Sequence, residues 1–340
     1  MKQDMRVGLV YDLRDDYLAL GFSEEETAEF DSVGTIDALD NALSRLGWRV
    51  ERVGRGQELA KRLVAGERFD MVFSIAEGLK GRSREAQVPA LCELFDQPYA
   101  FSDPLTMAAT LDKAVAKRIV RDQGVATAPF AVIENVNGPM PEMIYPVFVK
   151  PIAEGTGKGC ANASRVNTPE DLQREASRLI TAFHQPVLVE SYLAGREFTV
   201  GITGNGAAAK IIAVMEIAVK PDADGGVYSY EIKEDWEPYV NLVLSKDMEA
   251  RRAGQTALAA YRALGCRDGA RVDIRSDGNH KPHFLEVNPI AGLNPTHSDL
   301  PILTTKAGKS YDWLIGEIMR SACARQGVSI PRVRIRAQAA

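Results

Sequence analysis

Two short runs near the C-terminal end of the chain alternate polar and apolar residues with period two, and a turn signal joins them. In ARVDIR, Arg271 and Asp273 alternate with apolar residues, and in HFLEVN, Glu286 and Asn288 do the same. The intervening SDGN is typical of a tight turn. A period of two places alternate side chains on one face of a strand. The pattern therefore predicts an antiparallel hairpin with all four polar side chains on one face, Asp273 opposite Glu286 and Arg271 opposite Asn288.

The oxygen atoms on this face are the ligands that a hard cation prefers. Two carboxylates and a carboxamide that converge repel one another unless a cation joins them, and oxygen ligands suit Mg²⁺ better than a soft metal. Because Mg²⁺ keeps waters or recruits phosphate oxygens, such a site favours a phosphorylated substrate. The apolar residues Phe284, Leu285 and Val287 are expected to anchor this strand in the core. The alternative interpretation is a hairpin whose solvent-facing side is merely polar.

The composition is that of an ordinary globular enzyme. Of the 340 residues, 45% are hydrophobic and 26% are charged, and the net charge of -5 gives no general attraction to nucleic acid or to an anionic membrane. No apolar run approaches the roughly 20 residues of a membrane span, and the N-terminal apolar stretch is too short for a signal peptide, so we expect a cytoplasmic protein. The four cysteines have no CxxC spacing and the four histidines have no metal-ligand spacing. These patterns argue against a disulfide framework and a zinc site.

Hydrophobic periodicity divides the chain into three predicted domains and a tail. Residues 1–105 show a strand–helix–strand pattern in RVGLVY, TIDALDNALSRLG and WRVERV, which predicts a small parallel α/β domain. Residues 106–195 begin with a helix at TLDKAVAKRIVRDQG and continue with strands at YPVFVKPI, GCANASRV and PVLVESYL. Residues 196–322 contain two predicted hairpins, separated by a helix and by the aperiodic PDADGGVYSYEIKEDWEP, which is typical of a lid or binding loop. A basic tail, residues 323–340, follows.

The predicted middle domain contains lysines and glycines of the kind that bind phosphates. Lys150 ends the apolar run VFVK, and the loop EGTGKG follows it. The glycines would let backbone N–H groups approach phosphate oxygens, although the same residues are compatible with a flexible turn between strands. The loop is not a P-loop, because Lys158 is followed by glycine instead of Ser or Thr. Lys113 and Lys117, four residues apart on the predicted helix, would by themselves indicate a solvated helix face.

Seven motifs, taken in order, resemble those of the D-alanine–D-alanine ligases in the ATP-grasp superfamily. They are QPYAFS, LDKAVAK, VFVKP with EGTGKG, VLVESYLAGREFTV, YSYEIK, GARVDI and FLEVNPIAGL. The similarity extends from about Gln87 to Ala322 and is weak before that. It implies a mixed α/β (α+β) ATP-grasp fold of three domains, in which ATP lies between two antiparallel sheets of the middle and third domains.

The resemblance implies an ATP site at the matching positions. Its residues are Lys113, Lys150, Glu154, Gly155, Thr156, Gly157, Glu190, Tyr192, Leu193, Glu197 and Lys233. Lys113 and Lys150 would hold the α- and β-phosphates. Glu190 would accept the adenine amino hydrogen, and Glu197 would bind the ribose hydroxyls. Lys233 would close over the phosphates with its loop and shield a reactive intermediate from water.

The resemblance also implies the metal ligands and the reaction. Asp273, Glu286 and Asn288 would ligate two Mg²⁺ ions, for which Mn²⁺ could substitute. The γ-phosphoryl group of ATP would pass to a substrate carboxylate, and the amine of a second substrate would attack the resulting acyl phosphate. Arg271 and the backbone N–H of Gly292 would stabilise the oxyanion that forms in this attack.

The first predicted domain departs from the family where the ligases seat their first amino acid. In place of a glycine-rich loop with a glutamate, the chain reads LVYDLRDDYLALGFSEEE. Asp12, Asp15 or Asp16 would then supply the anion, unless the first substrate carries no α-ammonium group there. Glu77 replaces the usual histidine, and Glu234 replaces a common tyrosine. Unless they face solvent, both glutamates would favour cationic or amine-bearing substrates and repel a dicarboxylate.

The predicted function is an ATP- and Mg²⁺-dependent ligase that joins the carboxylate of one amino-acid-like substrate to the amine of another. Tyr230, His297 and Ser298 would also contact the substrates, although one extra residue blurs the register at NPTHSD and His297 could simply make a loop hydrogen bond. The alternatives are a ligase for amino acids other than D-alanine, a depsipeptide synthase, and a nucleotide-binding regulatory protein without turnover. The presence of Arg271 beside the metal ligands argues against the last alternative. Because family members are commonly dimers, we expect a homodimer.

Overall fold

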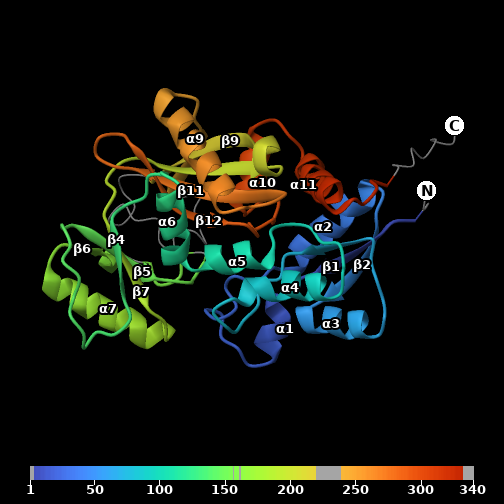
Figure 1. Ribbon diagram of the computed structural model, residues 1–340, viewed down its shortest axis with the longest axis horizontal. Coiled ribbons are helices and arrows are strands. Elements are labelled where there is room, and N and C mark those ends of the chain that lie inside the picture. Colours follow the sequence, from blue (N-terminus) through green and yellow to red (C-terminus); the bar gives the residue numbers. More distant parts are fainter. Residues whose placement is uncertain (1–3, 156, 161, 220–238, 332–340) are drawn as a thin grey trace.

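A parallel sheet forms the N-terminal part of the fold. The computed structural model describes residues 4–155, 157–160, 162–219 and 239–331, and Figure 1 shows this sheet toward the blue end of the chain. Its elements are β1 (Arg6–Val10), α1 (Arg14–Ala19), α2 (Val33–Arg45), β2 (Arg49–Gly54), α3 (Gly56–Val64), β3 (Met71–Ser74), the 3₁₀ helix η1 (Arg84–Ala86) and α4 (Gln87–Leu94). The strand order is β2–β1–β3, and β1 is parallel to both neighbours. The expected parallel arrangement is confirmed.

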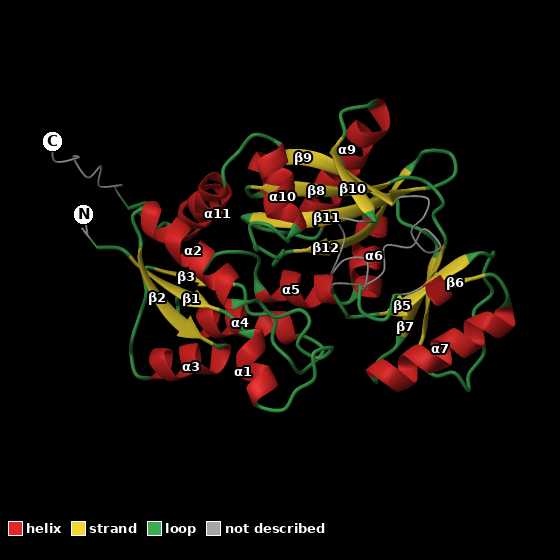
Figure 2. Ribbon diagram, turned by 180° about the vertical axis from the view of Figure 1, so that it is seen from behind, coloured by secondary structure: helices red, strands yellow, loops and turns green. Residues whose placement is uncertain are grey.

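Both faces of this sheet are covered. On one face, Leu9 of β1 packs in one cluster with α2 and with α11 (Tyr311–Gln326), which Figure 2 shows beside α2. On the other face, Val72 of β3 packs with α3 and with Val88 of α4. A sheet buried on both sides needs strands without polar alternation, as RVGLV and MVFS illustrate. The last helix thus returns to the first sheet and runs past residue 323, the predicted start of the tail.

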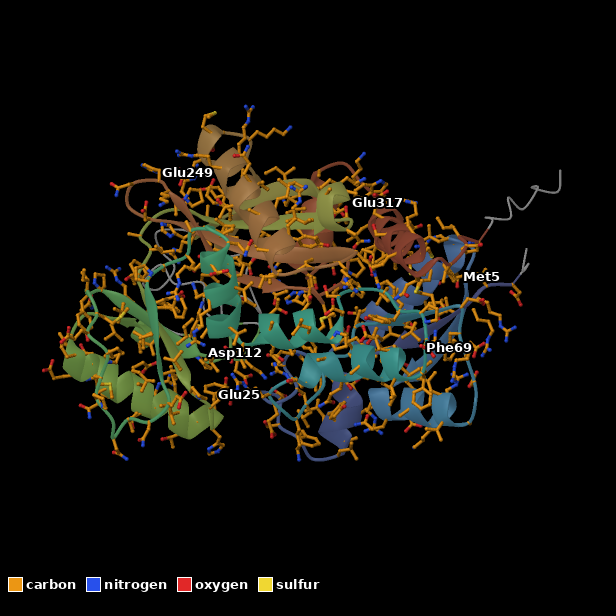
Figure 3. The ribbon with its side chains drawn as sticks, in the orientation of Figure 1. Met5, Glu25, Phe69, Asp112, Glu249 and Glu317 are labelled. Atoms are coloured by element: carbon orange, nitrogen blue, oxygen red, sulfur yellow. The ribbon has the colours of Figure 1, made fainter. Side chains whose placement is uncertain are left out.

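Two helices, α5 (Pro104–Leu111) and α6 (Lys113–Asp122), join the first sheet to the rest of the fold. The helix predicted around residues 110–124 is confirmed as α6, but it begins at Lys113, and residues 110 and 111 end α5 instead. The backbone of Asp112 is extended, and its carboxylate accepts two N–H groups of the first turn of α6. Figure 3 labels Asp112 at this junction. The cap starts a new helix at Lys113, whose backbone N–H donates to a carbonyl at the end of the middle sheet, 3.1 Å away.

The middle sheet is antiparallel. Its elements are β4 (Phe130–Ile133), β5 (Val147–Pro151), β6 (Arg165–Val166), α7 (Pro169–Phe183) and β7 (Val187–Ser191), and the strand order is β4–β7–β5–β6. α7 covers one face, where Leu172 packs with Val149 and Val189. The strand predicted at GCANASRV is largely wrong, since among its described residues only the last two form a strand and a 3₁₀ turn precedes them.

The third sheet is also antiparallel and has five strands in the described part of the chain. Its elements are β8 (Glu197–Thr203), β9 (Lys210–Val219), β10 (Val240–Leu244), α9 (Met248–Ala263), β11 (Gly269–Ser276), β12 (Pro282–Asn288) and α10 (Asp299–Lys306). The strand order is β10–β9–β8–β11–β12. α9 packs on one face, where Tyr261 and the alanines of the helix meet Val272 and Ile274.

The hairpin predicted between β11 and β12 is confirmed in type and in register. Arg271 pairs with Asn288 and Asp273 pairs with Glu286, as the period of two predicts. A β-bulge follows Asp273, so that Leu285 has no partner in the register. The expectation that Leu285 anchors the strand in the core is wrong, because the bulge turns this side chain into a cavity. Phe284 and Val287 are buried in the core as expected.

Candidate active site

Two adjoining cavities lie between the three sheets. The first encloses about 830 Å³, part of it open to solvent, and is lined by β5 and β7 of the middle sheet and by β11 and β12 of the third. The second encloses about 1040 Å³ and is lined by β12, the loop after it, and glutamates of the N-terminal part. Lys113, Glu154 and Glu286 line both cavities, so the two are continuous at these residues.

Most residues predicted to bind ATP line the first cavity. They are Lys113, Lys150, Glu154, Gly157, Glu190, Tyr192, Leu193 and Glu197. Gly155 lines the second cavity. Thr156 and Lys233 lie outside the described residues, as do the predicted substrate residues Tyr230 and Glu234.

A buried glutamate between two lysines forms the floor of the first cavity. Glu190 of β7 lies 2.6 Å from the Nζ atom of Lys117 and 2.9 Å from that of Lys150. Burial alone would raise the pKa of Glu190, but the two lysines lower it to about 2. Lys117 is 0% exposed and also donates to the Thr127 hydroxyl at 2.8 Å, so the expectation of a solvated helix face is wrong. Both carboxylate oxygens of Glu190 thus contact lysines, although the resemblance assigns this carboxylate to the adenine amino group.

An aromatic ring in contact with two guanidinium groups lies at another wall of this cavity. The guanidinium groups of Arg165 and Arg275 lie 4.5 Å and 5.2 Å from the centre of the Tyr192 ring. Arg275 also forms an ion pair with Glu197 at 3.0 Å. Arg275 was not predicted from the sequence, although it lies two residues beyond Asp273 and so continues the alternation of Arg271 and Asp273 on β11. A flat ligand that binds here would contact the Tyr192 ring, the two arginines and the Glu197 carboxylate.

Hydrogen bonds to Glu154 and Gly155 hold the loop after β5 in place. The Glu154 carboxylate accepts from Gln185 at 2.6 Å and from Lys158 at 3.3 Å, and its backbone carbonyl accepts from the Nζ atom of Lys113 at 2.5 Å. The backbone N–H of Gly155 donates to Glu29 at 2.6 Å. The two lysines at this loop, Lys113 and Lys158, provide positive charge for an anionic ligand.

The polar face of the hairpin opens into both cavities. Asp273 and Glu286 line the first, and Glu286 and Asn288 line the second. Asp273 accepts from the Thr199 hydroxyl at 2.8 Å and from Arg271 at 3.0 Å. Glu286 lies 3.4 Å from the Nζ atom of Lys113. Both carboxylates thus contact cations of the protein and still face open space.

The donors on this face fit a hard cation that also binds phosphate. In the described ranges, no three His, Cys, Asp or Glu side chains are arranged to hold a metal. Two carboxylates would therefore need Asn288 and ligand oxygens to complete the coordination of Mg²⁺. The Nδ2 atom of Asn288 is buried and has no hydrogen-bond partner among the described residues. An unpaired amide beside two carboxylates is consistent with a site that a ligand completes.

Arg271 points into the second cavity between two carboxylates. Its guanidinium contacts Asp273 at 3.0 Å and Asp299 at 3.4 Å. Burial would lower the pKa of Arg271, but these carboxylates raise it, so the side chain stays charged. Asp299, at the start of α10, lines the same cavity and was not predicted from the sequence.

The loop after β12 brings the remaining predicted residues to the second cavity. Gly292, His297 and Ser298 all line it. A side chain at Gly292 would have its Cβ atom only 2.7 Å from the Ser298 hydroxyl, so glycine leaves this wall open. The His297 side chain is exposed, and its backbone N–H donates to Asn294, in agreement with the simple loop contact.

The N-terminal wall of the second cavity differs from the sequence prediction. Asp12 is buried away from it, where it accepts from the Tyr17 hydroxyl at 2.7 Å and from a backbone N–H at 2.9 Å, and it lines another cavity. Asp15 and Asp16 are exposed on α1. The structure therefore does not bring these three aspartates to the site. Glu29, which was not predicted from the sequence, lies there instead.

Glu77 lines this wall as predicted, together with Glu85 of η1, which was not predicted. Burial raises the pKa of Glu85 to about 7. Burial and the nearby Glu85 and Glu29 raise the pKa of Glu77 well above its usual range. Glu29 differs, because Arg84 and Lys158 offset its burial and lower its pKa. The wall thus contains one carboxylate that Arg84 and Lys158 keep ionised and two whose pKa is raised.

Known proteins match the chain over most of its length. The family model described as D-ala D-ala ligase C-terminus matches residues 119–320. An uncharacterized protein of Sinorhizobium fredii is 33% identical over 75% of this chain and 75% of its own length. A D-alanine–D-alanine ligase of Xanthomonas axonopodis pv. citri is 32% identical over 88% of this chain and 91% of its own length.

Solved structures agree with this match. Two structures of D-alanine–D-alanine ligase from Bacillus anthracis, the first complexed with ATP, cover 95% of this chain and 99% of their own, with TM-scores of 0.69 and 0.70. Their sequence identities of 21% and 20% make this a likeness of fold. The chain has the ATP-grasp fold and belongs to the D-alanine–D-alanine ligase family.

Proposed function

We propose that this chain is an ATP- and Mg²⁺-dependent ligase that joins the carboxylate of one amino acid to the amine of another, with ADP and phosphate as the other products. The observation that carries the proposal is the junction of the two cavities at Lys113, Glu154 and Glu286. A nucleotide in the first cavity would place its terminal phosphate at this junction, where an acid in the second cavity can reach it.

The first cavity supports the nucleotide part of the proposal. Lys113 and Lys150 would contact the phosphates, and Glu197 would accept the ribose hydroxyls in place of its contact with Arg275. The backbone near Tyr192 would meet the adenine edge. Glu190 has the role of holding Lys150 in position, since its oxygens already contact lysines at 2.6 and 2.9 Å.

Asp273, Glu286 and Asn288 would hold the magnesium. When bound, Mg²⁺ offsets the repulsion between the phosphate oxygens and the attacking carboxylate. Around it, the protein supplies fixed cations: Lys113 lies beside Glu286, and Arg271 beside Asp273.

Two displacements make up the proposed reaction. A carboxylate oxygen of the first substrate attacks the γ-phosphorus, the bond to the bridging oxygen of ADP breaks, and an acyl phosphate forms. The amine of the second substrate then attacks the carbonyl carbon and loses a proton, and inorganic phosphate leaves. Arg271 and the Gly292 N–H would stabilise the oxyanion of this step, for which one donor is typically worth about a hundredfold or more in rate. The carboxylates beside Arg271 support this role because they hold its guanidinium in the cavity.

The test is ADP release with a panel of D- and L-amino acids, followed by mass spectrometry of the product. We expect at least one pair to release ADP and to give a product of the summed mass less one water. Glu286→Gln should abolish this activity, whereas Glu58→Gln, an exposed residue on α3, should not change it. Tight ATP binding without ADP release for any pair would refute the ligase and favour a regulatory nucleotide-binding protein. Adding lactate as the second substrate tests the depsipeptide alternative.

Two further expectations stay predictions. The family resemblance supports a homodimer, and light scattering should then give twice the 37.1 kDa of one chain. No described helix is both long and apolar enough to cross a membrane. The expected cytoplasmic location can be checked by cell fractionation.

A further inference from the structure

Two carboxylates on the N-terminal wall of the second cavity have no hydrogen-bond or ion-pair partner among the described residues. Glu77 follows β3 and Glu85 lies in η1, and both line the cavity. Glu85 is only 9% exposed. Within the described ranges, neither side chain forms a hydrogen bond or an ion pair. A buried carboxylate without a partner is costly, and native proteins rarely retain one that serves no purpose.

The other acidic side chains of this cavity are already neutralised. Each has a basic partner: Glu29 with Arg84 at 2.8 Å, Glu154 with Lys158 at 3.3 Å, Glu286 with Lys113 at 3.4 Å, and Asp299 with Arg271 at 3.4 Å. After this pairing, Glu77 and Glu85 are the two acidic groups of the cavity without a basic partner among the described residues. A cationic ligand would balance both carboxylates in their ionised form.

The position of this pair separates it from the nucleotide. Glu77 and Glu85 line the second cavity and not the first, whereas Lys150 lines only the first and Lys113 lies where the two cavities meet. A phosphate group would be repelled by the pair, and Mg²⁺ would be held at the opposite wall, on the hairpin. What faces the pair is the side of an amino-acid substrate that does not react.

We infer that one of the two ligated substrates is a basic amino acid, whose ammonium or guanidinium side chain binds together with its α-ammonium group against Glu77 and Glu85. A neutral amino acid brings one positive charge to this wall and leaves the other carboxylate unpaired. A substrate such as lysine, ornithine or arginine brings two. This inference rests on the proposed ligase function and adds the class of substrate to it.

The charge preference can be measured with a pair of matched substrates. Norleucine has the length of lysine but carries a methyl group in place of the ammonium. Both enantiomers of each are supplied with ATP and Mg²⁺, alone and together with alanine, and ADP and product mass are recorded. We expect kcat/KM for a basic amino acid to exceed that for norleucine and alanine by about tenfold or more, because a hydrogen bond to a charged group contributes that much.

Variants of the two carboxylates test their role. Glu77→Gln and Glu85→Gln should each lower kcat/KM for the basic substrate by about 10- to 100-fold, and should change that for norleucine much less. Glu58→Gln serves as the control, since this exposed glutamate pairs only with Lys61 on the same helix. Circular dichroism establishes that each variant is folded, which we expect because the substitutions remove an unpaired buried charge.

Three results would overturn the inference. One is equal kcat/KM for lysine and norleucine, and another is an equal loss for both substrates in Glu77→Gln and Glu85→Gln. Calorimetric titration of lysine and norleucine in the presence of ADP measures the preference without turnover, so equal affinities are the third. Ligation of neutral amino acids without preference for basic ones would leave the proposed ligase intact. Absence of ADP release with every pair would instead refute the ligase itself.

Discussion

Replacement of Glu190 should destabilise the protein more than replacement of either lysine that it contacts. The carboxylate is 3% exposed, and its pKa falls from 4.5 to about 2 in the folded protein, which corresponds to about 3 kcal/mol in favour of the charged form. Glu190→Gln removes this term and leaves Lys117 and Lys150 buried around a neutral amide. Breaking a buried ion pair from one side typically costs about 3–5 kcal/mol, and here two pairs break.

Lys117→Met is the variant against which the stability loss of Glu190→Gln is compared. It removes one cation, while Glu190 keeps Lys150 at 2.9 Å and the Thr127 hydroxyl keeps its hydrogen bond to the Phe284 carbonyl at 2.8 Å. Burial disfavours the charged form of Lys117 and lowers its pKa, so the apolar side chain also removes a desolvation cost. We expect a loss of about 1–3 kcal/mol for Lys117→Met, at least 2 kcal/mol less than for Glu190→Gln.

Urea unfolding at pH 7.5, followed by circular dichroism and tryptophan fluorescence, measures both losses. The free energy of unfolding of the Glu190→Gln, Lys117→Met double variant should fall by less than the sum of the two single decreases, because the two side chains contact each other. Glu58→Gln is the control and should not shift the midpoint. The reasoning would be refuted if Glu190→Gln were as stable as Lys117→Met, or if both lay within about 0.5 kcal/mol of the unaltered protein.

Three further predictions concern the two cavities. Glu85→Gln should be more stable than the unaltered protein by about 3 kcal/mol at pH 8, because burial raises the pKa of this carboxyl to about 7 and the variant has no carboxyl to ionise. This advantage should fade as the pH drops through 7 and be absent near pH 4, where Glu85 is protonated in the folded state and largely so in the unfolded state. Urea midpoints at pH 8 and pH 4 measure the difference. Cys160 lines the first cavity, so iodoacetamide should modify it in the folded protein, and ATP should slow the modification. Burial raises the pKa of Cys92 to about 12, so this thiol should react only after unfolding. Peptide mass mapping measures the modification of both cysteines. Glu197→Gln should raise the KM for ATP about tenfold with little change in kcat, since the charged acceptor of the proposed ribose contact is lost; an unchanged KM would contradict the assignment.

The candidate site was predictable where it depended on local periodicity. The alternation in β11 and β12 and the turn between them were sufficient to place Asp273 opposite Glu286, because a strand has only two faces and a tight turn sets the register. Several ordered motifs then indicated the family. Local patterns failed at the bulge that turns Leu285 into the cavity and at Asp112, which ends one helix and caps the next.

The sequence by itself determined most of the elements, the polar face of the hairpin and the family. Only the tertiary structure decided which charges share a cavity. Glu29 meets the N–H of Gly155 across 126 positions of the chain, and Glu77 and Glu85 face a loop more than 200 residues later. A lysine on a helix is solvated or buried depending on what packs against it, and Lys117 is buried because β7 and β12 close over it. Periodicity describes which face of an element is buried, but the partners of that face are set by contacts distant in sequence, where the free energy of burying a charge is decided.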